Sequence, residues 1–137
     1  MKDIRDYSLL GHNTFGIDAR CRRYLEYASA GEAQLVCREL TEADRPLLLI
    51  GEGSNLLLTG DYDGTVITPE RRFEVAVRTV DADADGVYLD CWAGTTFDDV
   101  VAYAVAHGYH GAENLSLIPG EVGASAVQNI GAYGAEA

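Results

Sequence analysis

The feature that most constrains the fold is a strand, a helix and a second strand in direct succession. Residues 21–28 (CRRYLEYA) are typical of a strand. Ser29 and Glu32 match a capping box, so a helix is expected to begin there and to end before Pro46. The continuous apolar run of residues 47–50 is typical of a strand buried on both faces. This succession predicts a βαβ unit with parallel strands and a right-handed crossover.

The strands expected beyond this unit are shorter. Residues 56–58 and 65–68 have the composition of two short strands. Residues 73–80 and 87–93 predict an antiparallel pair joined by the acidic turn 81–86. An antiparallel pair does not continue a βαβ pattern, so a second structural region is expected here.

A second helix is predicted to begin at a cap formed by Thr95 or Thr96. It runs to about His107 and stops at Gly108, a residue suited to the position after a helix. The remaining residues are expected to form loops with short helical turns. Residues 1–12 are polar and without a period, which predicts a loosely held arm.

The boundary between two lobes is predicted at residues 69–72, where Pro69 interrupts the strand pattern. The expected fold is α+β. It has a small βαβ lobe over residues 1–70 and an antiparallel-sheet lobe over residues 71–137.

The charge distribution restricts the partners. The net charge is −12, which argues against nucleic acid as a partner. Residues 1–78 hold all 10 Lys and Arg, and residues 79–137 hold none. A phosphate bound in the second region must therefore be held by backbone N–H groups. No apolar run reaches the length of a membrane span, and we expect a cytoplasmic protein without a membrane partner.

No metal site is predicted. Residues 81–86 begin like a calcium-binding loop, but Trp92 stands where the bidentate glutamate is required, so a solvated turn is expected. His107 and His110 lie on either side of a helix end and have no third ligand at a useful spacing. The cysteines fit neither a disulfide framework nor a zinc site: Cys21, Cys37 and Cys91.

The loop of residues 51–55 (GEGSN) directly follows an apolar strand, where ligand loops of parallel units lie. Its successive N–H groups suit an anion, with the Ser54 hydroxyl and the Asn55 amide as further donors. It is not a Rossmann fingerprint, because Leu56 replaces the third glycine. The alternative is a tight strand connection. Neither Ser54 nor Ser125 has the surroundings of an acyl-transfer nucleophile.

The segment 117–134 (LIPGEVGASAVQNIGAYG) is the second candidate binding element. A short helix over residues 122–128 is expected to direct its N-terminus, near residues 123–125, at a pyrophosphate. Gln128 and Asn129 suit the mixed polar edge of a flavin or adenine ring. The residues that would lie along or beside the ring are Gly131, Ala132, Tyr133 and Gly134. The alternative is a glycine-rich loop closed by an aromatic side chain.

With these segments the chain resembles the UDP-N-acetylenolpyruvoylglucosamine reductases, also called UDP-N-acetylmuramate dehydrogenases, of bacterial cell-wall synthesis. The matching segments occur in the family's order and cover nearly the whole chain. They are Asn13-Thr14-Phe15-Gly16, Gly51-Glu52-Gly53-Ser54-Asn55, Gly64-Thr65-Val66-Ile67, Glu113-Asn114-Leu115, Leu117-Ile118-Pro119-Gly120, Gly123, and Gln128-Asn129-Ile130-Gly131-Ala132-Tyr133-Gly134.

The resemblance implies a two-lobed FAD-binding fold with the flavin held by the two loops. NADPH would reduce FAD, which would reduce UDP-N-acetylglucosamine enolpyruvate to UDP-N-acetylmuramate. Ala124 and Ala126 replace a serine and a proline that relatives often carry, which puts one hydroxyl contact in doubt. The implied FAD-binding residues are Ile50, Gly51, Gly53, Ser54, Asn55, Leu56, Ile118, Pro119, Gly120, Gly123, Ser125, Gln128, Asn129, Ile130, Gly131, Ala132, Tyr133 and Gly134.

Family members are longer than this sequence. The resemblance therefore implies the N-terminal FAD-binding part, with an incomplete second lobe, no substrate domain and no catalytic residue in the 137 residues. The complete enzyme is expected to be a monomer. Two alternatives are a different FAD-dependent oxidoreductase of the same superfamily and a non-catalytic nucleotide-binding module.

Overall fold

The computed structural model describes residues 1–78 and 86–136. The chain divides into two compact units, Met1–Glu70 and Arg71–Ala137. We call them unit 1 and unit 2 and describe each by itself. Residues 81–85 of the predicted acidic turn, where the rejected calcium loop begins, and the last two residues of the strand expected over 73–80 lie outside the described residues.

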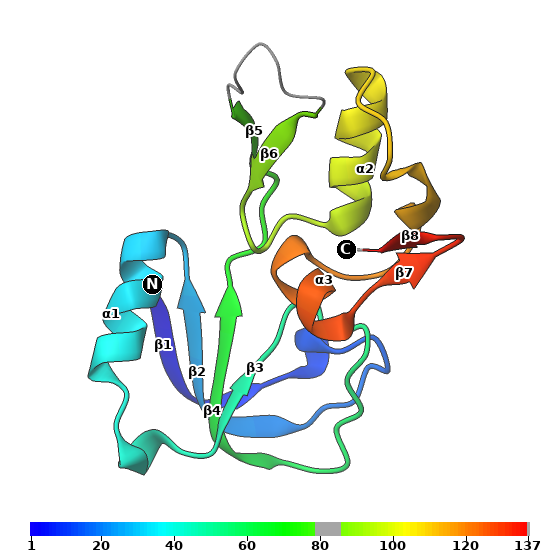
Figure 1. Cartoon of the computed structure of the whole chain (residues 1–137). Coiled ribbons are helices and arrows are strands. Elements are labelled where there is room, and N and C mark those ends of the chain that lie inside the picture. Colours follow the sequence, from blue (N-terminus) through cyan, green and yellow to red (C-terminus); the bar gives the residue numbers. More distant parts are fainter. Residues whose placement is uncertain (79–85, 137) are drawn as a thin grey trace. The chain divides into compact units, whose positions relative to one another are not determined.

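Unit 1 is built on a four-stranded sheet with the order β1-β2-β4-β3 (Figure 1). Strand β1 is antiparallel to β2, whereas β2 and β3 are both parallel to β4. The strands predicted to flank the first helix are therefore parallel, as expected, but β4 lies between them. The strand bounds are β1 Lys2–Ser8, β2 Arg20–Tyr27, β3 Leu47–Leu49 and β4 Tyr62–Pro69.

Helix α1, Ala30–Glu39, begins where the sequence predicts. The Ser29 hydroxyl accepts a hydrogen bond from the Glu32 N–H at 3.1 Å. The Glu32 carboxylate in turn accepts from the Ala28 N–H at 2.7 Å, which differs by one residue from an ideal capping box. The short 3-10 helices η1, Leu10–His12, and η2, Glu42–Asp44, complete the unit.

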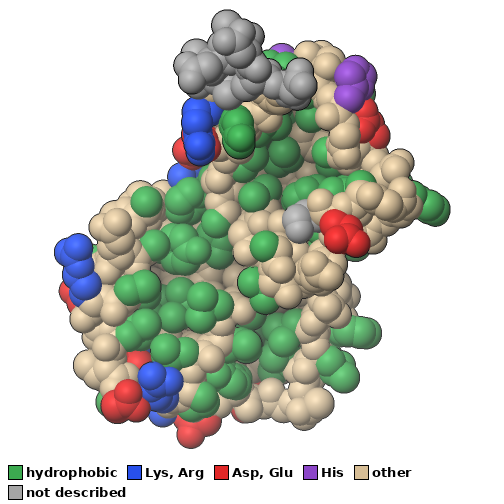
Figure 2. All heavy atoms as spheres, in the orientation of Figure 1, with side chains coloured by type: hydrophobic (Ala, Val, Ile, Leu, Met, Phe, Trp, Pro, Cys, Tyr) green, Lys and Arg blue, Asp and Glu red, His purple; other side chains and the backbone are tan. Residues whose placement is uncertain are grey.

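The core of unit 1 lies on both faces of the sheet. The larger cluster includes Leu9, Tyr24 and Val66, each fully buried, and the smaller one packs Leu25 and Ile67 against Val36 of α1. On the face shown in Figure 2, hydrophobic side chains spread over unit 1, and its charged side chains gather toward the edge.

Three local predictions for unit 1 are wrong. Residues 1–12 are not a loose arm, because residues 2–8 form β1. Residues 56–58 form no strand, and Leu58 instead fills the core. Strand β3 is not buried on both faces: it is an edge strand, and Leu49 is 75% exposed.

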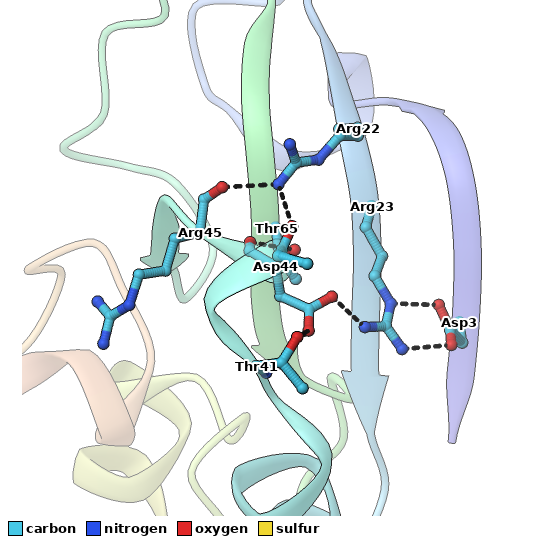
Figure 3. Close-up of polar contacts among 8 residues, drawn as sticks. Asp3, Arg22, Arg23, Thr41, Asp44, Arg45 and Thr65 are labelled. Carbon is cyan, nitrogen blue, oxygen red and sulfur yellow. Dashed lines mark hydrogen bonds and ion pairs between the residues drawn. The ribbon is translucent and has the colours of Figure 1, made fainter.

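A polar network joins the turn before β3 to the sheet (Figure 3). The Asp44 carboxylate accepts from the Thr41 N–H at 2.9 Å and from Arg23 at 2.6 Å, which together lower its pKa to about 2. Arg23 also binds Asp3 on β1 through two hydrogen bonds. The fully buried Thr65 hydroxyl donates to the Asp44 carbonyl at 2.7 Å. This network connects β1, β2 and β4 to η2.

Unit 2 contains the antiparallel pair β5, Val75–Arg78, and β6, Tyr88–Cys91. Helix α2, Phe97–Ala106, is followed by Gly108 with φ +71°, as the sequence predicts. Thr96 occupies the N-cap position as predicted, but its side chain makes no capping hydrogen bond. Then come η3, Glu113–Leu115, α3, Val122–Gln128, and the hairpin strands β7, Gly131–Ala132, and β8, Ala135–Glu136.

Thr95 has a different role from the capping that was predicted for it. Its fully buried hydroxyl contacts the Arg72 and Glu74 carbonyls and accepts from the Glu74 N–H. The side chain therefore holds residues 72–74, the segment that leads into β5, rather than the start of α2. In the part of the chain that the structure describes, no helix combines the length and apolar character needed to cross a membrane.

Candidate functional site

The loop of residues 51–55 follows β3 in unit 1. Ile50 anchors its start, because this residue is buried and its N–H donates to the Ile67 carbonyl at 3.0 Å. Leu56 anchors its end by packing against the larger core cluster. Within the described residues, the backbone N–H groups of Gly51, Gly53 and Asn55 donate to no protein acceptor. These N–H groups are therefore unused within the described part of the protein, and their binding of an anion stays a prediction.

Gly53 is required by packing within the protein. Its φ is +75°, and a Cβ there would overlap the His12 carbonyl oxygen and lie 2.8 Å from the carbonyl carbon. A larger residue would therefore displace either the loop or the turn at His12.

Helix α3 has the bounds that the sequence predicts, but its first N–H groups are occupied. The N–H of Val122 donates to the Thr95 carbonyl and that of Gly123 to the Ala93 carbonyl, both at 2.9 Å. The N–H groups of Ala124 and Ser125 donate to the Glu121 carbonyl. These bonds use the donors that a pyrophosphate would need, so the start of α3 does not support the predicted phosphate contact.

Two of the predicted contact residues in α3 instead serve its packing. A Cβ at Gly123 would lie 2.9 Å from the Ala93 Cβ, so this glycine lets α3 approach residue 93 closely. The buried Ser125 hydroxyl donates to the Val122 carbonyl at 2.8 Å, within the same helix. Neither position presents a free polar group in this structure.

The bend before α3 is held by a residue that the sequence reasoning did not select. The Asp98 carboxylate accepts from the Leu117 N–H and from the Ser116 hydroxyl, each at 2.8 Å. These two bonds lower the pKa of Asp98. They stabilise Leu117 at φ +62°, a conformation that a leucine rarely adopts. Gly120, at φ +132°, then accepts from the Phe97 N–H at 2.9 Å through its carbonyl.

The end of α3 exposes the predicted ring-binding groups. Asn129 ends the helix at φ +50°, and Ile130 is buried behind it. The side chains of Gln128 and Asn129 are exposed and have no partner among the described residues. Their amides are therefore available both to donate and to accept.

Tyr133 and Gly134 form the turn of the β7–β8 hairpin. Their φ values are +51° and +86°, and positive φ at both central residues is what a type I′ turn requires. The Asn114 side chain donates to the Tyr133 carbonyl at 3.3 Å, which connects η3 to the turn. The Tyr133 side chain is 93% exposed, so its ring is available to a ligand.

Exposed apolar side chains accompany Tyr133 in unit 2. Leu117 is 82% exposed and Val127 is 88% exposed, whereas Tyr88, the next most exposed large apolar side chain among the described residues of this unit, is 57% exposed. Pro119 is exposed and Ile118 and Ala132 are partly buried. The two predicted segments therefore differ: the loop in unit 1 offers backbone donors, and the segment in unit 2 offers amides and apolar surface.

The rest of the described chain offers no competing metal chemistry. Among the described residues, no group of three His, Cys, Asp or Glu side chains could hold a metal ion. His110 lies 2.9 Å from Glu113, whose pKa falls to about 2 because its carboxylate accepts from its own N–H and that of Gly111 and contacts His110. Glu113 therefore stabilises its own turn.

Comparison with known proteins defines the class. Residues 22–137 match the FAD binding domain family, and the chain belongs to this family. The predicted α+β FAD-binding fold and FAD as the cofactor are thereby confirmed. Taken by itself, the loop in unit 1 has N–H donors suited to phosphate oxygens, and the segment in unit 2 has exposed amides and apolar side chains suited to a ring system.

Closer relatives point to one enzyme. The chain is 52% identical over 133 residues to UDP-N-acetylenolpyruvoylglucosamine reductase of Bacteroides fragilis and 44% identical over 135 residues to that of Porphyromonas gingivalis. These matches cover 95% and 98% of the chain but only 38% and 39% of the relatives. The crystal structure of the Thermus caldophilus reductase matches with a TM-score of 0.66 and 25% identity, covering 98% of this chain and 44% of that one. The resemblance inferred from the sequence is confirmed.

Proposed function

We propose that this chain provides the FAD-binding part of a UDP-N-acetylenolpyruvoylglucosamine reductase. The complete enzyme would use NADPH to reduce UDP-N-acetylglucosamine enolpyruvate to UDP-N-acetylmuramate in peptidoglycan precursor synthesis. The observation that carries the proposal is the identity of 44–52% with such reductases over nearly the whole chain, together with the FAD binding domain match. We also propose a monomeric complete enzyme located in the cytoplasm.

The loop in unit 1 would bind phosphate oxygens of FAD. Its N–H donors at Gly51, Gly53 and Asn55 have no acceptor among the described residues, and the Ser54 hydroxyl lies in the same loop. A phosphate held by backbone donors needs no cation beside it. Ile50 and Leu56 would act by holding the two ends of the loop in the core.

The segment in unit 2 would bind the ring system. The free amides of Gln128 and Asn129 would hydrogen-bond its polar edge, and the Tyr133 ring would pack beside it and exclude water. When bound, FAD supplies hydride transfer. Pro119, Gly120, Ile130, Gly131, Ala132 and Gly134 would shape the backbone around these groups. Gly123 and Ser125 would contribute through the packing of α3.

The experiment uses the full-length protein that carries this sequence. We expect it to purify with the absorbance of a bound flavin and to oxidise NADPH only when the enolpyruvyl substrate is present. Reduced flavin that reacts with oxygen but never with this substrate would overturn the substrate assignment. A colourless protein that cannot be reconstituted with FAD would overturn the whole proposal.

Single residues can be tested in the same protein. Gln128→Ala is expected to weaken FAD binding by about tenfold, the loss that one hydrogen bond to a ligand represents. Gln34→Ala is the matched control, because Gln34 is an exposed glutamine on α1, outside both segments. Equal FAD affinity of the two variants would remove Gln128 from the proposed site.

A further inference from the structure

The motif Asn13-Thr14-Phe15-Gly16 has no role in the site described above, yet its backbone meets the loop of residues 51–55. We propose that Asn13 is a positioning residue for FAD binding: it fixes the turn of residues 9–17, and the turn's backbone holds Gly53 in place. This inference rests on the proposed function, in which the loop binds phosphate oxygens of FAD.

Asn13 is buried, and its side-chain amide closes the turn. The Asn13 Nδ2 donates to the Leu9 carbonyl at 2.8 Å and to the Ile17 carbonyl at 2.9 Å. Its Oδ1 accepts from the Ile17 N–H at 2.9 Å. The amide thus uses both of its donors and its acceptor, and it joins the two ends of the turn.

One end of this turn is anchored in the core of unit 1. Leu9 is fully buried, and its N–H donates to the Ala19 carbonyl at 2.8 Å. The His12 ring lies 4.9 Å from the Tyr24 ring and its Nε2 lies 3.2 Å from the Tyr7 hydroxyl. These contacts fix the beginning of the turn, and the hydrogen bonds of the Asn13 side chain fix Ile17 relative to it.

The middle of the turn contacts Gly53 with no space between the two backbones. A Cβ on Gly53 would lie 2.8 Å from the His12 carbonyl carbon and 3.0 Å from the Asn13 Cα. The Thr14 N–H also donates to the Gly53 carbonyl at 3.4 Å, a long bond. The position of Gly53 therefore depends on the position of the turn.

Substitution of Asn13 by alanine removes all three side-chain bonds. The Ile17 N–H and carbonyl then lose their partner in a partly buried place, and the buried Leu9 carbonyl loses one donor, which favours a shift of the turn. The His12 carbonyl would move with the turn, and Gly53 would lose its support. The donors of residues 51–55 would no longer be preorganised for a phosphate.

The test compares Asn13→Ala with Thr65→Val in the full-length protein. Thr65→Val also removes a buried hydrogen bond from unit 1, but that bond goes to the Asp44 carbonyl and not to this turn. Titration of the apoprotein with FAD gives the affinity, and hydrogen exchange of the Thr14 amide, which donates to the Gly53 carbonyl, reports the contact between the turn and the loop. Asn13→Ala is expected to weaken FAD binding by about tenfold or more and to speed this exchange, and Thr65→Val is expected to do neither.

If the two variants change the exchange of the Thr14 amide equally and change FAD affinity equally, the positioning role is overturned. Gly53→Ala disturbs the same contact between residue 53 and the His12 carbonyl by adding a Cβ to the loop, so it should also weaken FAD binding. Because both changes break one contact, the double variant Asn13→Ala with Gly53→Ala should lose less than the sum of the two losses. Additive losses would contradict the proposal.

The experiment distinguishes failure of the proposed function from failure of the positioning role. If the unsubstituted protein binds no FAD, the proposed function fails. Unchanged exchange of the Thr14 amide in Asn13→Ala refutes the positioning role, whether or not FAD binds. Asn13→Ser, which keeps a small polar group, replaces Asn13→Ala if the alanine variant does not fold, and a wild-type FAD affinity in it would contradict the proposal.

Discussion

The substitution Thr65→Val removes one buried hydroxyl from the network in Figure 3. The Thr65 side chain is fully buried, and its hydroxyl donates to the Asp44 carbonyl at 2.7 Å, a short and well-formed bond. Valine has nearly the same shape but cannot donate, so the change isolates the hydrogen bond. The Thr65 N–H still donates to the Pro46 carbonyl at 2.9 Å, which keeps β4 beside the turn.

The expected cost combines two contributions. The lost bond itself contributes about 1 kcal/mol, and a buried carbonyl without a donor costs about 1 kcal/mol more. No other donor to the Asp44 carbonyl is found among the described residues. We therefore expect unit 1 to lose about 2 kcal/mol of its free energy of unfolding, a factor of about 30 in the folding equilibrium.

Native-state hydrogen exchange measures this loss within unit 1, independently of the rest of the protein. The slowest amides of β2 and β4 should exchange about thirtyfold faster in Thr65→Val. Thr68→Val is the matched control on the same strand, because Thr68 is also buried but its hydroxyl reaches the Pro69 carbonyl only at 3.4 Å. Its effect should stay below about fivefold. Equal effects at the two positions would refute the assignment of the cost to the Thr65 bond.

The other predictions concern unit 2 and the whole chain. The bonds from the Leu117 N–H and the Ser116 hydroxyl lower the pKa of Asp98 from its ordinary value of 3.8. Their contribution to the stability of unit 2 is therefore complete above pH 3.8 and is lost as the pH falls through the lowered pKa of the folded state. Exchange of the Leu117 amide should become faster over this acid range. The carboxyl of Glu113 should titrate with a midpoint of about 2 in a carbon NMR titration, and a midpoint near 4.5 would contradict its contacts. Tyr133→Asn should stabilise the hairpin turn by about 0.5 kcal/mol yet weaken FAD binding, because asparagine suits positive φ but cannot replace the ring. The isolated 137 residues should not turn over NADPH with the enolpyruvyl substrate, since they span about 38% of the reductases they match.

Elements with local chemical signals could be predicted from the sequence. The bounds of α3, the Ser29 start of α1 and the Gly108 end of α2 all agree with the structure. In each case the signal is a cap residue or a short periodic run, and its partner groups lie within a few positions along the chain.

Elements held by distant partners could not be predicted in this way. Strand β1 has no hydrophobic period, because its outer position in the sheet leaves most of it exposed. Cross-strand ion pairs hold it instead: Asp3 with Arg23, and Lys2 with Glu26. The insertion of β4 between β2 and β3 likewise depends on pairing between segments far apart in sequence.

The residues of the candidate site likewise divide into those that the local sequence identifies and those that it does not. The loop of residues 51–55 and the exposed side chains at Gln128 and Tyr133 are visible in the sequence as glycines, amides and an aromatic residue. Asn13, Asp98 and Asn114 support these segments from elsewhere in each unit, and no local pattern marks them. Only their occurrence in motifs shared with the reductase family, for Asn13 and Asn114, could have identified them.

The glycines show why a pattern alone does not assign a ligand. A glycine-rich sequence predicts that the backbone approaches another group closely, and this holds for Gly53 and Gly123. The neighbours there are the His12 carbonyl and Ala93, parts of the same protein. At Gly134, by contrast, no atom lies within 4 Å of the Cβ position, and positive φ is the reason for glycine. The groups that could contact a cofactor are the unused N–H donors, the exposed amides and the Tyr133 ring, whereas Gly53 and Gly123 let the segments that carry these groups pack against the rest of their units.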